Sequence, residues 1–153
     1  MAARIINAAS GVYPGLFIVE FDIGRAGGEV DTGFDFKEGD VIQDAWVDVD
    51  TLEATSGTKT IDIGLLSSES GGDADGIMDG LSTAAAGVIK GTLISTGQTR
   101  GALLRADESG AGVLVPESHA VTTAKSLTYT LGAAHTELVA KGYVLFFRSP
   151  SRL

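Results

Sequence analysis

The chain has 153 residues, no cysteine, 21 glycines and a formal net charge of −9, with 44% apolar and 20% charged residues. This length fits one domain with a self-sufficient core, and the absence of cysteine excludes disulfides and thiolate metal sites. The negative charge disfavours nucleic acid as a partner, because that affinity rests largely on Lys and Arg neutralising phosphates.

Residues 1–15 are expected to form an extended N-terminal arm without regular structure, because Gly11, Pro14 and Gly15 interrupt them. A frayed terminus is the alternative. No apolar stretch of signal-peptide length follows, and no later run is long enough to span a membrane, so no membrane association is expected. If the arm orders on a partner, its apolar side chains would make the contact. These residues are Ile5, Ile6, Val12 and Tyr13.

Alternation of apolar and polar residues predicts the clearest strands, because successive side chains of a strand point to opposite faces. These strands cover 16–23, 45–51, 59–65 and 126–132. The first should bury Phe17, Val19, Phe21 and Ile23. Residues 45–65 are predicted to form an antiparallel hairpin with one face in the core, since Ser56-Gly57 suits a connecting turn.

The remaining elements are shorter. Strands are expected at 34–36, 88–95, around 102–105, at 113–115 and at 143–148, the last apolar enough to be central and buried on both faces. Residues 75–86 could form one short helix, limited by glycines. The prediction is an all-β domain over 16–153, a compact β-sandwich or jelly-roll-like barrel of about 8–10 short strands with at most one short helix.

Charge is unevenly distributed along the chain. Sixteen of the twenty acidic residues lie between Glu20 and Asp79, against three basic residues in the same stretch. Two interpretations remain open: a solvated acidic face, or an acidic surface matched to a basic partner.

No catalytic constellation is recognisable. The two histidines, His119 and His135, lie in different segments and are expected in surface loops, and neither a G-x-S-x-G turn nor a phosphate-binding Gly-Lys-Ser/Thr loop occurs. Carboxylate pairs of the glycosidase type remain possible, but no pair stands out. The sequence therefore indicates no catalytic residue, no cofactor and no enzyme.

One stretch, Asp73–Gly80, begins like a calcium loop. Ile77 occupies the position of the third ligand, and Ala84 stands where the twelfth residue should be Glu. The segment 69–79 is therefore predicted to be structural and metal-free, with its aspartates capping the helix that follows.

The succession from Asp40 to Gly87 resembles a pattern in small structural proteins of tailed bacteriophages known as head decoration, or cement, proteins. The matching parts are Asp48–Thr51, Gly57–Gly64, Gly71–Gly76, Asp79–Leu81 and the closing Gly142–Val144. The resemblance covers residues 30–95, and the rest of the chain only in overall plan.

This resemblance implies a compact β-sandwich or jelly-roll-like fold and a virion protein made in the host cytoplasm. It implies binding to the major capsid protein on the outer surface of the assembled capsid, often as a homotrimer. Two other classes remain open. One is a carbohydrate- or receptor-binding β-sandwich of a phage fibre, which would need exposed aromatic residues for stacking on sugar, with Trp46 and Tyr13 as the candidates. The other is a β-sandwich enzyme.

Overall fold

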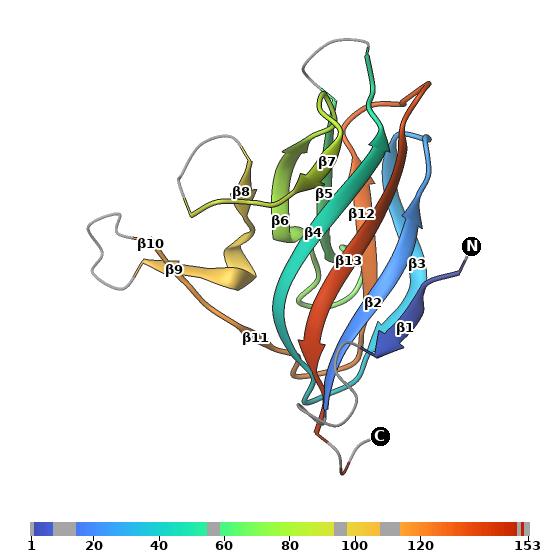
Figure 1. Cartoon of the computed structure of the whole chain (residues 1–153). Coiled ribbons are helices and arrows are strands. Elements are labelled where there is room, and N and C mark those ends of the chain that lie inside the picture. The colour runs from blue at the N-terminus through green and yellow to red at the C-terminus, as the bar shows by residue number, and fades with distance from the viewer. Residues whose placement is uncertain are drawn as a thin grey trace.

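The computed structural model describes residues 2–7, 15–54, 59–93, 98–107, 114–149 and 151. Over these ranges the chain is all-β, with thirteen strands and one 3-10 helix, η1 (Ala102–Leu104). Two large antiparallel sheets pack face to face around one hydrophobic core, and neither closes into a barrel (Figure 1).

The front sheet, nearer the viewer in Figure 1, has the order β1-β2-β13-β4-β11, with β7 also paired to β4. Its strands are β1 (Arg4–Asn7), β2 (Leu16–Ile23), β13 (Val139–Phe147), β4 (Val41–Thr51), β11 (His119–Ala120) and β7 (Gly87–Ile89).

The rear sheet has the order β3-β12-β5-β6-β8. Its strands are β3 (Gly28–Phe36), β12 (Lys125–Leu131), β5 (Thr60–Leu65), β6 (Asp73–Ser82) and β8 (Thr99–Arg100). A separate two-stranded pair, β9 (Arg105–Asp107) with β10 (Leu114–Pro116), projects to one side in Figure 1.

The core lies between the two sheets, where the alternating apolar residues of both meet. On β2, Val19, Phe21 and Ile23 are buried and Phe17 packs partly against the core, which confirms the inner face predicted for 16–23. The Phe21 ring stacks on Tyr129 of β12 with 6.0 Å between ring centroids. Four further phenylalanine rings cluster elsewhere in the core, with centroids 5.2–5.8 Å apart. They are Phe17, Phe34, Phe36 and Phe146.

The predicted 45–65 hairpin is wrong, although both of its strands exist. β4 pairs with β13, β7 and β11 in the front sheet, whereas β5 pairs with β12 and β6 in the rear sheet. The connection between them holds Glu53, whose buried carboxylate accepts the backbone N–H groups of Thr136, Glu137 and Leu138 at 2.9–3.3 Å. A side-chain period of two fixes which face is buried, but it does not fix the neighbouring strand.

The predicted helix at 75–86 is also wrong, because residues 73–82 form β6. Ile77, Met78 and Leu81 are buried in the core from this strand. The carboxylate of Asp62 on β5 accepts the Gly80 N–H at 2.7 Å, which fixes a cross-strand contact. A neighbouring strand thus satisfies backbone groups of a glycine-rich segment that is a poor helix former.

Three other expectations need correction. Residues 102–104 are helical rather than extended, and in the described part of the predicted strand 88–95, residues 88–93, only Val88 and Ile89 belong to a strand, β7. β13 is central but buried on one face, since only alternate residues from Ala140 to Phe146 are buried. Residues 4–7 of the expected arm form β1, which pairs with β2.

Candidate functional site

Buried charges in the described ranges hold turns and strands together. Arg148 donates from Nε to Asp40 Oδ1 at 2.8 Å and from Nη2 to Oδ2 at 2.6 Å, and the two side chains are 7% and 0% exposed. Asp40 also accepts the Lys37 N–H at 2.8 Å. This ion pair therefore joins the turn at 37–40 to the end of β13, and its role is structural.

The histidines lie in different elements. His135 is buried, with Nδ1 2.8 Å from the Ala133 carbonyl oxygen and Nε2 3.1 Å from Thr83 Oγ1, so the prediction of a surface position is wrong for it. His119 lies half-buried in β11, where burial lowers its pKa. Over the part of the chain that the structure describes, no group of three or more His, Cys, Asp or Glu side chains is arranged to hold a metal ion.

The acidic segment is folded against the rear sheet. Burial, together with the neighbouring carboxyl of Asp75, raises the pKa of Asp73 to about 6. Burial also raises the pKa of Asp62. The aspartates do not cap a helix, because the chain continues from Asp73 as β6. That residues 69–79 bind no metal remains a prediction.

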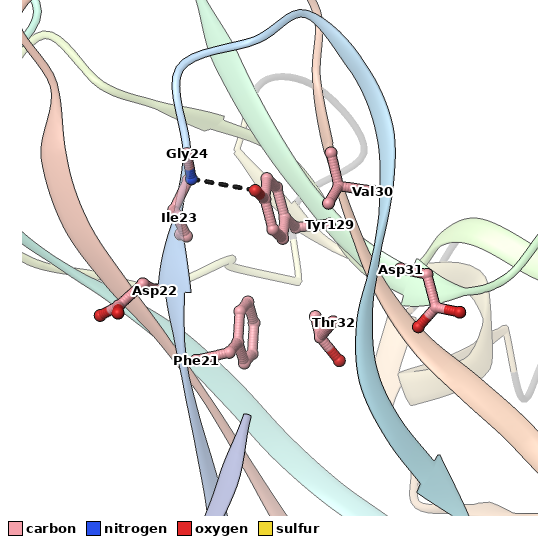
Figure 2. A pocket seen from close by; sticks show the side chains of 8 residues that line it. All are labelled: Phe21, Asp22, Ile23, Gly24, Val30, Asp31, Thr32 and Tyr129. Atoms are coloured by element: carbon pink, nitrogen blue, oxygen red, sulfur yellow. Dashed lines mark hydrogen bonds between the residues drawn. The ribbon is translucent and has the colours of Figure 1, made fainter. Parts of the chain in front are cut away.

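A cavity of about 260 Å³ opens between β2 and β3. Figure 2 shows that the rings of Phe21 and Tyr129 point into it, whereas the carboxylates of Asp22 and Asp31 point away. Ile23 also lines the cavity. The Tyr129 hydroxyl accepts the Gly24 N–H at 2.9 Å (Figure 2). The cavity is therefore an opening into the core rather than a place where two carboxylates meet on a substrate.

A more informative surface is the outer face of the front sheet. Directly paired residues of neighbouring strands lie on the same face. One row across this face is Ile6, Ile18 and Leu145, which meets Asp44 on β4, and the next is Leu16, Phe147 and Val41. None of these six apolar residues is fully buried, and Phe147 is 38% exposed. Soluble antiparallel sheets usually carry polar side chains on such a face, so we name these two rows the apolar half.

The other half of this face is charged and aromatic. Trp46 and Tyr143 are directly paired, and their rings stack at 5.5 Å with 13° between their planes. Glu20 accepts two bonds from Arg4, at 3.0 and 2.8 Å, and these lower its pKa. Lys141 lies 3.1 Å from Asp22, and this contact raises the lysine pKa. Because Trp46 already gives one ring face to Tyr143, less of it remains for stacking on a sugar.

Of the predicted partner-binding residues, the structure places Ile5 and Ile6 on β1, with their side chains on opposite faces. Ile5 pairs with Val19 on the inner side at the sheet edge and is 41% exposed, while Ile6 pairs with Ile18 on the outer face. Val12 and Tyr13 lie outside the described residues. Sequence reasoning missed the apolar half, although the unbroken apolar run of β13 was its signal.

A solved phage structure contains a chain with a similar fold. A chain in the acidic stable capsid structure of Helicobacter pylori bacteriophage KHP30 superposes with a TM-score of 0.50 at 9% identity, covering 95% of this chain and 93% of that one. A chain of the cyanophage Pam1 capsid asymmetric unit gives 0.47 at 10% identity, covering 94% and 92%.

The fold is shared with a phage capsid component. The resemblance to phage head proteins drawn from the sequence thus extends to the fold. No family model and no curated protein matches the sequence. No helix in the described ranges has the length and apolar character needed to cross a membrane.

Proposed function

We propose that this protein is a non-enzymatic structural component of a phage virion that binds the outer surface of the assembled capsid and stabilises it. The observation that carries the proposal is the apolar half of the front sheet, which a rigid sandwich presents to solvent. Exposed apolar patches of this kind mark interaction surfaces. The fold shared with a chain of a phage capsid structure supports this reading.

The proposed partner is the major capsid protein, and the proposed oligomer is a homotrimer. A rigid domain loses little conformational entropy on docking, and several copies joined in one oligomer bind a lattice more tightly than one copy alone. The acidic composition, with a net charge of −9, supports a protein partner rather than nucleic acid.

The N-terminal segment 1–15 is proposed to contribute to the capsid contact through Ile5, Ile6, Val12 and Tyr13. The position of Ile6 supports this for one of the four, because its side chain continues the row formed by Ile18 and Leu145. We also propose the corresponding domain division, an N-terminal arm at 1–15 and a β-sandwich domain at 16–153.

The test is co-sedimentation of the purified protein with undecorated capsids of its source phage, alongside analytical ultracentrifugation of the protein alone. We expect saturable binding and a three-chain species. Binding should raise the temperature at which the capsids rupture, because a ligand that binds only the intact shell stabilises it. Absence of binding at micromolar protein would overturn the proposal, and a glycan array would then test the fibre alternative.

A further inference from the structure

Two aspartates at the charged end of the front sheet face solvent. Asp48 and Asp50 are exposed on the outer face of β4, and neither makes a hydrogen bond or salt bridge within the described ranges. Lys141 is directly opposite Asp48 in the strand register, yet its Nζ lies 3.1 Å from Asp22 and 3.4 Å from Glu20, both on β2. The lysine opposite Asp48 is therefore held by other carboxylates.

The same two aspartates line a groove with an aliphatic wall. The groove encloses about 300 Å³ between the end of β4 and the start of β13. Val139 and Ala140 form its apolar side, and Lys141, whose Nζ is held by Asp22 and Glu20, is its fifth lining residue. Val139 is 46% exposed, and Val88, which pairs with Asp48 from β7, is 70% exposed. The groove thus combines aliphatic surface with two carboxylates that make no ion pair with its one lysine, whose charge is taken up by Asp22 and Glu20.

An aromatic pair lies next to the groove on the same face. Trp46 precedes Asp48 by two residues, so both side chains point outward, and Trp46 stacks on Tyr143. Aromatic ring faces attract cations, and guanidinium groups in particular. Carboxylates, aliphatic surface and aromatic rings together match an arginine or lysine side chain, whose apolar stem and charged tip need different surroundings.

We propose that this groove binds a basic side chain, from an extended segment of the major capsid protein, with its stem on Val139 and its charge on Asp48 and Asp50. The proposal deepens the proposed function and rests on it, because it names the chemistry of the capsid segment. Charge complementarity argues for this occupant: the protein carries a net charge of −9, and the two carboxylates face solvent in the groove.

The test compares the double variant Asp48→Asn/Asp50→Asn with a control that removes the same charge elsewhere. Asp31→Asn/Glu117→Gln is suitable, because both residues are exposed and lie away from the groove. In the control, the side-chain amide oxygen introduced at position 31 can still accept the Gly33 N–H that Asp31 accepts at 2.8 Å. Binding of each protein to undecorated capsids is measured at low and at physiological salt.

We expect the groove variant to bind about ten-fold more weakly at low salt, which corresponds to about 1.4 kcal/mol. Its affinity should also depend less on salt than that of the intact protein. Salt screens the ion pair between the basic side chain and the two aspartates, and the variant lacks this pair. The control should bind within about two-fold of the intact protein.

The outcomes separate the two proposals. Failure of the intact protein to bind capsids overturns the proposed function and this inference with it. Tight binding by the intact protein and equally tight binding by the groove variant would leave the function standing and overturn the inference alone. The groove variant could also form a different oligomer in ultracentrifugation and still bind capsids fully. That result would show that the groove contacts a second copy of this chain, and it would also overturn the inference.

Discussion

The outer faces of the two sheets differ in what covers them. On the rear sheet, a bulge of β6 covers part of the outer face. Ile63 and Leu65 of β5 are two residues apart, but their partners on β6, Met78 and Asp73, are five residues apart, so the extra β6 residues form the bulge. This bulge lies on Gly64, and Thr128, which pairs with Gly64, is fully buried. On the front sheet, Leu145 and Phe147 face outward and are only partly covered.

This difference shows which face is available to a partner. The covered face is lined by small and polar side chains, among them Thr128 and Thr130, whose hydroxyls are buried without a hydrogen-bond partner in the described part of the chain. The open face carries aromatic and aliphatic residues, which are stabilised when another protein covers them. The β6 bulge covers polar residues on the outer face of β5 and β12, whereas the apolar half of the front sheet is left open to solvent.

The largest expected loss of stability comes from a side chain that displaces the bulge from the rear sheet. A Cβ at Gly64 would lie 2.2 Å from the Asp73 carbonyl oxygen, a backbone atom that cannot rotate away. Gly64→Ala should therefore lower the free energy of unfolding by about 3 kcal/mol, measured by urea denaturation. At Gly132 the nearest atom is the rotatable Thr60 Oγ1 at 3.1 Å, so Gly132→Ala should cost less than about 1 kcal/mol. Equal effects at both positions would show that the bulge is not rigid.

Removal of the Thr128 hydroxyl, which is buried beneath the bulge, should have a smaller effect and should increase stability. Thr128→Val removes an unsatisfied polar group without changing the side-chain shape, and should raise the unfolding free energy by about 1 kcal/mol. Thr83→Val is the matched control, because Thr83 Oγ1 lies 3.0 Å from the Lys59 carbonyl oxygen and 3.1 Å from His135 Nε2. That variant should be destabilised by about 1 kcal/mol. Loss of stability in Thr128→Val would mean that the hydroxyl has a partner.

The covered face should also make stability depend on pH. The folded pKa of Asp73, about 6, lies above its value of 3.8 in the absence of the fold. The folded state therefore holds this proton more tightly, and the stabilisation is complete below about pH 4 and lost as the pH rises through 6. Asp73→Asn should be more stable than the intact protein at pH 7 by at most about 1 kcal/mol, since partial exposure screens the interaction.

The measurement is thermal or urea unfolding at pH 4.5 and pH 7. The difference in stability between the two should be smaller for Asp73→Asn than for the intact protein. An unchanged difference would contradict the partly buried placement of this carboxyl at the start of the bulge.

The last variant, on the open face, should affect binding more than stability. Phe147→Ser changes a side chain that is 38% exposed, so the free energy of unfolding should fall by only about 1–2 kcal/mol. Capsid co-sedimentation should weaken about ten-fold or more, because a large aromatic side chain at an interface centre often dominates affinity. Ala124→Ser, in an exposed turn before β12, is the control and should bind normally. Unimpaired binding by Phe147→Ser would remove the apolar half from the contact.

Much of the fold could be predicted because local patterns carry it. The alternation on 16–23 correctly identified the inner residues of β2, and the strands at 45–51, 59–65 and 126–132 all exist. Glycine and proline correctly indicated frequent turns. The helix expected at 75–86 failed because local propensity was weak and the hydrogen-bonding partner of β6, the strand β5, lies outside the segment.

The candidate site was harder to predict from the sequence than the strands were. The run Tyr143–Phe147 is apolar at every position, and two environments produce that pattern: a strand buried on both faces, or a strand buried on one face and exposed as a docking surface on the other. Ile6 is predicted as a contact residue from its place in the N-terminal segment. Its row with Ile18 and Leu145 became visible only once the register of β1, β2 and β13 was known.

The sequence by itself determined that the chain is all-β and which residues of its main strands face inward, because both follow from the alternation of neighbouring side chains. Tertiary structure alone decided that β4 and β5 belong to opposite sheets, that the acidic bulge covers Thr128, and that the apolar half remains open. These are contacts between residues far apart in the chain. Their free energies depend on strand pairing and packing, which no single segment encodes.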